Sequence, residues 1–158
     1  MQHLDANLAF LQEKIKDIKI ALFKSEMNSE LQLPNNIIET LKVEEEGYVW
    51  FFTSCAGDYA KSIEKSFYAY LDYYKKGTDC RIQLSGIATI VEDDNGDFLT
   101  ISNYSKSTAS RLVLVKMKIM QAEYFENKQQ LSSSWKEKVV GAFNNLFFPD
   151  THRIFDFN

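Results

Sequence analysis

Two hydroxyls and two ammonium groups near one strand-to-helix junction are the side chains of this sequence best suited to chemistry. Thr53 is the last residue of a β-branched and aromatic run over residues 48–53, and Ser54 follows it. A helix predicted over residues 58–66 carries Lys61 and Lys65. Hydroxyls beside a helix N-terminus and an ammonium group can bind a phosphate. Many strand–loop–helix junctions bind nothing, so these residues taken alone favour a structural role.

The other reactive residue types do not form a catalytic set. His3 and His152 lie near opposite ends of the chain, without a nucleophile or carboxylate at a spacing typical of a catalytic unit. Residues 62–65 match the Ser-x-x-Lys pattern of penicillin-binding enzymes, but its companion motifs are missing. We therefore assign no catalytic side chain and no metal ligand, and expect a cofactor to carry any chemistry.

Composition narrows the class of protein and of partner. The 158 residues suit one domain, 1–158, and 12 Phe and 8 Tyr favour sheet. A net charge of −4 argues against nucleic acid as a partner, because nucleic-acid binding needs a cationic face. Cys55 and Cys80 suggest free thiols in a reducing compartment, and the sequence has no apolar run long enough for a membrane helix. We expect a cytoplasmic protein with no membrane partner.

The elements that would position Thr53 and Ser54 are mainly strands. Apolar spacing predicts an amphipathic helix ending near Asp17, and the charged residues 44–47 predict a solvated hairpin tip. Gly86 inside a strand predicts a bulge or a close backbone approach. Residues 98–111 are predicted to be a loop or a short helix. The predicted strands cover residues 20–25, 31–33, 37–43, 48–53, 68–74, 81–91, 112–119 and 121–126.

Two further patterns bear on assembly. Tyr68, Tyr70 and Tyr74 fall on one face of their strand; they are typical of cross-strand packing, and the alternative is a dimer contact or a pocket wall. A capping box at residues 134–137 predicts a closing helix, followed by an aromatic tail. We expect this C-terminal part, about residues 132–158, to pack on the barrel or on a dimer partner.

Four segments in this order resemble one known family. They are IKDIKIALF (15–23), TLKVEEEGYVWFFTS (40–54), AYLDYYKKGTDCRIQLSGIATIVED (69–93) and LVLVKMKIMQAEYFE (112–126). They resemble the FMN-binding split-barrel proteins related to pyridoxamine 5'-phosphate oxidase, specifically the small general stress proteins. The resemblance implies an α+β, mainly β fold, an antiparallel split β-barrel with flanking helices, and a homodimer with FMN at the subunit interface.

The resemblance also implies a set of cofactor-binding residues. Thr53 and Ser54 would hold the FMN phosphate together with a basic residue from the following helix. The family's lysine position falls on Tyr59 here, and Lys61 is the available substitute. Relatives read Arg-Pro-Met where this chain has Asn36, Ile37 and Ile38, so a cation is missing. The implied set is Asn36, Ile38, Thr40, Phe52, Thr53, Ser54, Tyr59 and Lys61.

A second departure concerns the cover of the flavin. Relatives carry a helix with an aromatic-proline segment between the Ser-Gly strand and LVLVKM, whereas residues 98–111 are shorter and polar. We hypothesise that the helix predicted over residues 135–148 takes this role. The implied function is an FMN-binding protein, and if it is an enzyme, its implied activity is that of an FMN-dependent oxidoreductase. The alternatives are a flavin-free binding or stress accessory protein and, by fold analogy alone, a pocket for haem or a deazaflavin.

Overall fold

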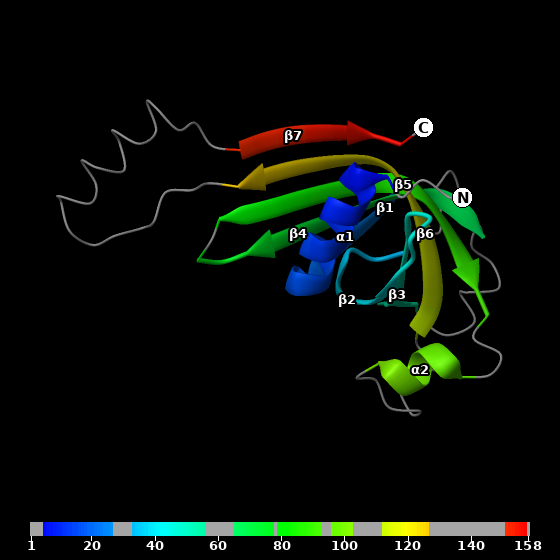
Figure 1. The fold of residues 1–158 in the computed structure, drawn as a ribbon. Coiled ribbons are helices and arrows are strands. Elements are labelled where there is room, and N and C mark those ends of the chain that lie inside the picture. The colour runs from blue at the N-terminus through cyan, green and yellow to red at the C-terminus, as the bar shows by residue number, and fades with distance from the viewer. Residues whose placement is uncertain are drawn as a thin grey trace.

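A computed structural model describes residues 5–26, 33–55, 65–77, 79–92, 96–102, 112–126 and 151–157, and Figure 1 shows the arrangement of their elements. In chain order the elements are α1 (Ala6–Ile18), β1 (Ile20–Glu26), β2 (Asn36–Val43), β3 (Tyr48–Ser54), β4 (Ser66–Lys75), β5 (Cys80–Val91), α2 (Asp97–Ile101), β6 (Leu112–Glu126) and β7 (Thr151–Asp156).

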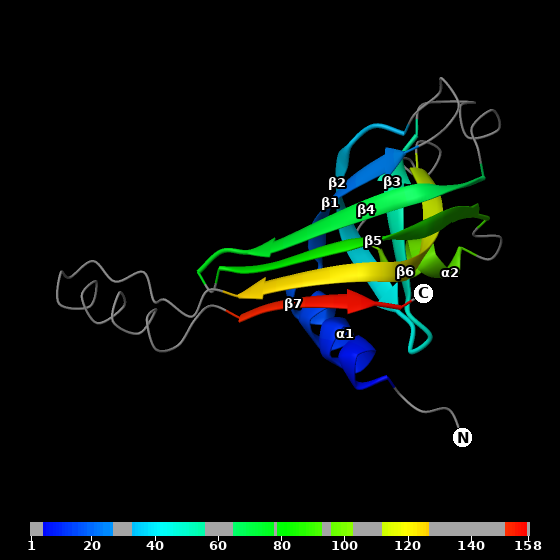
Figure 2. The same ribbon diagram turned by 90° about the horizontal axis from the view of Figure 1, so that it is seen from above.

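The strands form one antiparallel sheet that closes on itself. The order is β3-β2-β1-β4-β5-β6-β7, and an additional pairing of β3 with β6 closes the first six strands into a barrel. Strand β7 lies outside this barrel along β6, and Figure 2 shows β4, β5, β6 and β7 side by side. The predicted split β-barrel with flanking helices is confirmed.

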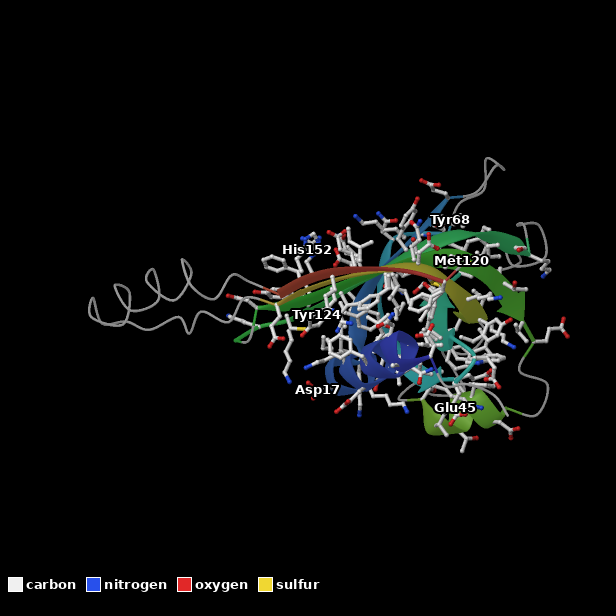
Figure 3. All side chains as sticks on the ribbon, turned by 45° about the horizontal axis from the view of Figure 1, so that its top comes forward. Asp17, Glu45, Tyr68, Met120, Tyr124 and His152 are labelled. Atoms are coloured by element: carbon white, nitrogen blue, oxygen red, sulfur yellow. The ribbon has the colours of Figure 1, made fainter. Side chains whose placement is uncertain are left out.

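Strand β6 is continuous, whereas the sequence predicted two strands divided near residue 120. Its first half pairs with β3 from Leu112 to Lys118, and its second half pairs with β7 from Gln121 to Glu126. The backbone carbonyl of Met120, labelled in Figure 3, accepts a hydrogen bond from the Phe157 amide at 2.7 Å. The alternation changes phase here because Met120 is an extra residue at a bulge, between Ile119, which pairs with Gly86, and Gln121, which pairs with Ser85.

Gly86 lies at the bulge that the sequence predicted. The register between β5 and β6 shifts between Ser85 and Gly86. A Cβ atom at Gly86 would lie 1.8 Å from the Lys118 carbonyl oxygen and 3.0 Å from the Met120 nitrogen. A residue without a side chain is therefore needed for β6 to pair with β5 at this distance.

Helix α1 contributes one apolar face to the core. Its N-cap Asp5 accepts hydrogen bonds from the amides of Asn7 and Leu8 at 2.9 and 3.4 Å. Leu11 and Ile15 are fully buried, which confirms the helical spacing seen in the sequence. The helix lies on the side of the sheet to which Tyr124 points, whereas His152 lies on the opposite side (Figure 3).

Most of two predicted helices falls outside the described residues. Of the helix expected over residues 58–66, the end is wrong, because Ser66 begins β4 and pairs with Thr89. The rest of it, with Tyr59 and Lys61, lies outside the described residues, as does the helix expected over residues 135–148. Beyond that helix, residues 151–156 of the aromatic tail form β7 and pair with β6 of the same chain.

Candidate functional site

The ends of several strands meet at one end of the barrel, which we call the Ser54 end. Neighbouring strands are antiparallel, so β2, β4 and β6 begin where β3 and β5 finish. In β6, Leu112 pairs with Ser54, and Leu114 pairs with Val91. The residues that define the Ser54 end are Asn36, Ser54, Lys65, Val91 and Leu112.

Polar groups from two strands contact each other at the Ser54 end. The Asn36 side-chain amide donates a hydrogen bond from Nδ2 to Ser54 Oγ at 3.0 Å. Ser54 accepts this bond, so its own hydroxyl proton remains available to donate to a ligand. Both side chains are only partly buried and can be reached by solvent.

Thr53 differs from Ser54 although the two residues are adjacent. Side chains alternate between faces along a strand, and Thr53 lies on the core face with 0% exposure. Its Oγ1 has no hydrogen-bond partner in the described structure. A buried hydroxyl without a partner costs about 1–3 kcal/mol, and such groups are rare in folded proteins. The sequence had treated the two hydroxyls as equivalent ligands.

Lys65 is a described cation at this end that the predicted site omitted. Its carbonyl accepts a hydrogen bond from the Ile90 amide at 2.8 Å, which fixes the start of β4 against the end of β5. Burial raises the pKa of the Cys55 thiol, and the Lys65 ammonium opposes that rise. The charge of Lys65 therefore acts on the residue that follows Ser54.

Three other predicted site residues have side chains packed within the fold. Ile38 is 1% exposed and lies in the core, and Thr40 is also buried, with its Oγ1 2.5 Å from the Tyr73 hydroxyl. Phe52 points away from this core into a smaller cluster with Trp50 and Leu114. The described structure thus brings Asn36 and Ser54 into contact and places Ile38, Thr40 and Phe52 in packed surroundings.

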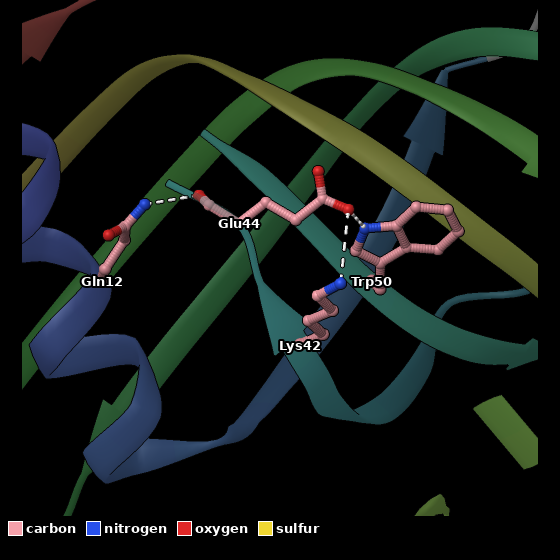
Figure 4. Close-up of polar contacts among 4 residues, drawn as sticks. All are labelled: Gln12, Lys42, Glu44 and Trp50. Atoms are coloured by element: carbon pink, nitrogen blue, oxygen red, sulfur yellow. Dashed lines mark hydrogen bonds and ion pairs between the residues drawn. The ribbon is translucent and has the colours of Figure 1, made fainter. Parts of the chain in front are cut away.

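The smaller cluster is covered by α2 and held by Glu44. Phe98 of α2 stacks on Trp50, with ring centroids 4.5 Å apart and planes 17° apart. Figure 4 shows the indole Nε1 of Trp50 donating to Glu44 Oε1 at 2.6 Å, with Lys42 3.9 Å from the same oxygen. The side chain of Gln12 on α1 donates to the Glu44 carbonyl. Glu44 was expected to be solvated, but it joins the hairpin to α1 and to the indole.

The outer face of the sheet carries two adjoining cavities. One of about 390 Å³ is lined by Ile20, Ile37, Tyr74 and the bidentate Arg81–Asp72 ion pair, whose N–O distances are 3.1 and 2.9 Å. The other, of about 430 Å³, extends across β1 and β4 to β7. The residues of one transverse row on this face are Ile37, Leu22, Asp72, Gln83, Glu123 and Ile154.

The described residues contain no group of three or more metal-ligating side chains. The two thiols are buried, and burial raises the pKa of both Cys55 and Cys80 above the ordinary value, which disfavours a nucleophilic thiolate. His152 is exposed and lies 2.6 Å from Glu123 at a sheet edge. None of the described helices is long and apolar enough to cross a membrane.

Comparison with known families identifies the class of protein that this barrel defines. The family model described as pyridoxamine 5'-phosphate oxidase like matches residues 6–142. The chain therefore belongs to this family, and the resemblance seen in the sequence is confirmed. Among curated proteins, none matches the sequence significantly.

Solved structures of similar fold come from several bacteria. A protein assigned as general stress protein 26 from Jannaschia sp. CCS1 has a TM-score of 0.59 at 12% identity, covering 97% of this chain and 100% of that chain. A protein related to general stress protein 26 from Clostridium acetobutylicum has a TM-score of 0.53 at 12% identity, covering 82% and 95%. A pyridoxamine 5'-phosphate oxidase-related, FMN binding protein from Nostoc punctiforme has a TM-score of 0.50 at 10% identity, covering 97% and 89%. At these identities the similarity shows the fold.

Proposed function

We propose that this protein binds FMN, with the phosphate at the Ser54 end of the barrel. The observation that carries the proposal is the contact between Asn36 and Ser54, whose polar side chains are both only partly buried at this end of the barrel. Amide and hydroxyl donors are the groups that phosphate oxygens accept from, so the residues present fit this cofactor. Tyr59 and Lys61 remain part of the proposed site as the sequence assigned them.

The proposed activity is that of an FMN-dependent oxidoreductase. When bound, the flavin supplies hydride or electron transfer. The protein's part is to bind and orient the cofactor and to exclude water, and no side chain is assigned as acid or base. Ile38, Thr40 and Phe52 support the site through packing, because their side chains lie in the core or in the smaller cluster. We place the protein in the cytoplasm on the basis of its buried free thiols.

Titration of FMN against the full chain tests the proposal by quenching of flavin fluorescence. We expect saturable quenching at micromolar FMN and a lower affinity in Ser54→Ala. Thr89→Ala, which removes an exposed hydroxyl on β5, serves as the control and should leave the affinity unchanged. Absence of quenching by the wild-type chain would overturn the proposal of flavin binding. Equal affinities of the wild type and Ser54→Ala for FMN would show that the phosphate does not bind at Ser54.

One observation favours a flavin-free accessory protein as the second candidate. By the resemblance noted in the sequence, Asn36 stands where relatives carry a cation. Its side-chain amide donates a hydrogen bond to Ser54 Oγ directly, without a ligand between them. A site whose polar groups pair with each other keeps its structure when the cofactor is lost. The FMN titration also decides between the two candidates, because a flavin-free protein gives no quenching.

We further propose a homodimer formed through the outer face of the sheet. Ile37 and Tyr74 line the same cavity on this face and are 59% and 57% exposed, and Ile154, at the other end of the transverse row, is 74% exposed. Exposed large apolar side chains on one face are typical of an interaction surface. Ile37→Asp should shift the mass measured by light scattering from dimer to monomer. Ile101→Asp on α2, also 59% exposed, is the matched control. A monomeric wild-type chain, or a dimer unaffected by Ile37→Asp, would contradict this interface.

A further inference from the structure

A third cavity lies between the C-terminal end of α1 and strand β2, and its volume is about 360 Å³. Cavities of this size can hold a small ligand. The Thr40 amide donates a hydrogen bond to the Lys19 carbonyl at 2.8 Å, which joins the two elements beside the cavity. We call this cavity the lysine hollow. The residues that line it are Lys16, Lys19, Thr40, Leu41, Lys42 and Val43, and none of them is acidic.

Lys19 has a backbone conformation that is unusual for a residue with a side chain. It caps the C-terminal end of α1 with a φ of 66°, where glycine is the common residue because it has no Cβ atom. Among the described residues, Asp79 is the only other non-glycine residue with a positive φ. Backbone strain of this kind concentrates at functional sites. The strain at Lys19 therefore points to a role of its side chain.

A β-bulge directs Lys42 toward the same cavity. Thr40 and Lys42 pair with consecutive residues of β3, so Leu41 is an extra residue in β2. Regular alternation would place Lys42 on the core face together with Thr40. Instead, Lys42 is exposed and the next residue, Val43, is buried. The bulge thus turns the Lys42 side chain out of the core, where it lines the lysine hollow.

Neighbouring carboxylates compensate little of the positive charge of the lysine hollow. In the described part of the chain, neither Lys16 nor Lys19 forms an ion pair. Lys42 Nζ lies 3.9 Å from Glu44 Oε1, and the Asp17 carboxylate accepts a hydrogen bond from a lysine of β4 instead. One lysine in the last turn of a helix is common because it compensates the helix dipole. The lysine hollow gathers three lysines from two elements.

We propose that the lysine hollow binds a diphosphate group, either free or as part of a nucleotide. A phosphate group carries about 1.5–2 negative charges near neutral pH, so two linked phosphates match three ammonium groups better than one phosphate does. Each ammonium can donate a charge-assisted hydrogen bond to a phosphate oxygen. The site is distinct from the proposed flavin site, because β2 begins at Asn36 and the lysine hollow lies along the last residues of this strand.

Isothermal titration calorimetry of the full chain with inorganic pyrophosphate, at constant ionic strength, tests the proposal. We expect pyrophosphate to bind more tightly than orthophosphate. Lys19→Gly and Lys16→Gln should each raise the pyrophosphate Kd about tenfold, the range of a charge-assisted hydrogen bond. Lys24→Gln removes an exposed lysine from the cavity of about 430 Å³ on the outer face and should leave this Kd unchanged.

Thermal melting separates a binding role of Lys19 from a structural one. Glycine adopts a positive φ without strain, so Lys19→Gly should melt at no lower temperature than the wild type while it loses affinity for pyrophosphate. A lower Tm together with an unchanged pyrophosphate Kd would show that the lysine serves the fold, and would overturn the proposal.

A parallel titration with ADP identifies the source of the diphosphate. Equal or weaker binding of ADP than of pyrophosphate points to free diphosphate, and tighter binding of ADP points to a nucleotide. If pyrophosphate binds no more tightly than orthophosphate, or if only Ser54→Ala loses affinity for it, the lysine hollow is not a diphosphate site. No flavin is present in these titrations, so their result is independent of whether the chain binds FMN.

Discussion

Replacing Gly86 by alanine tests whether the close approach of β5 and β6 at this residue contributes to the stability of the barrel. The added Cβ would lie 1.8 Å from the Lys118 carbonyl oxygen, and it would meet backbone, which cannot rotate away. Ordinary carbon–oxygen contacts are about 3.3 Å or longer, so the two strands must separate by roughly 1.5 Å. The adjacent ladder from Ile87 to Val91 would be distorted by this shift.

The expected cost is near the upper end of the range for overpacking, about 3 kcal/mol. For a chain of this length it corresponds to a fall in Tm of roughly 6–12 °C. Urea unfolding followed by tryptophan fluorescence measures the free energy of unfolding. Thr89→Ala, at an exposed position of the same strand, should change it by less than about 0.5 kcal/mol. If Gly86→Ala changed the free energy of unfolding no more than this control, the two strands would lie further apart at Gly86 than described, and the argument from contact distance would be refuted.

Four further predictions concern buried groups. Tyr73→Phe removes the hydrogen-bond partner of the buried Thr40 hydroxyl and should destabilise the fold by about 1–3 kcal/mol in urea unfolding, whereas Thr40→Val added to it should recover part of the loss. Burial raises the pKa of the Tyr73 phenol above its ordinary value, so the stability it contributes is present below pH ~10 and should fall as the pH rises further; a stability that increased above that pH would contradict the burial. Both cysteine thiols should resist a thiol-labelling reagent at neutral pH until urea unfolds the chain, and rapid labelling of the native protein would show that they are accessible. Phe155→Ala in β7 should cost about 3–5 kcal/mol, against little change for Ile154→Ala on the exposed face of the same strand.

Local patterns in the sequence determine most of the barrel. Alternation places Ala69, Leu71 and Tyr73 on the buried face of β4, and the structure confirms it. Gly86 marked the bulge because a glycine within a strand weakens it and is usually kept where the backbone bends or another strand approaches closely. The continuity of β6 was not predictable from these rules, since a bulge at Met120 changes the phase of its alternation and so imitates a break between two strands.

The candidate site was less predictable because it depends on which side chains meet across strands. Sequence order suggested Thr53 and Ser54 as a pair, but strand geometry places them on opposite faces. The bond between Asn36 and Ser54 joins residues 18 positions apart and follows from pairing of β2 with β3. Lys65 was visible in the sequence, although its place beside Ile90 is a tertiary contact.

Helix α1 and strand β7 lie far apart in the sequence but contact each other in the fold, and this has a consequence for biosynthesis. The Arg153 guanidinium lies over the rings of Phe10 and Phe155 at 4.9 and 4.7 Å and donates to the Asn7 side chain, 146 positions earlier. During translation, α1 is synthesised well before β7. Ribosome-bound intermediates therefore leave Phe10 without these contacts. Chains truncated before Thr151 should be recognised by chaperones and proteases as incomplete.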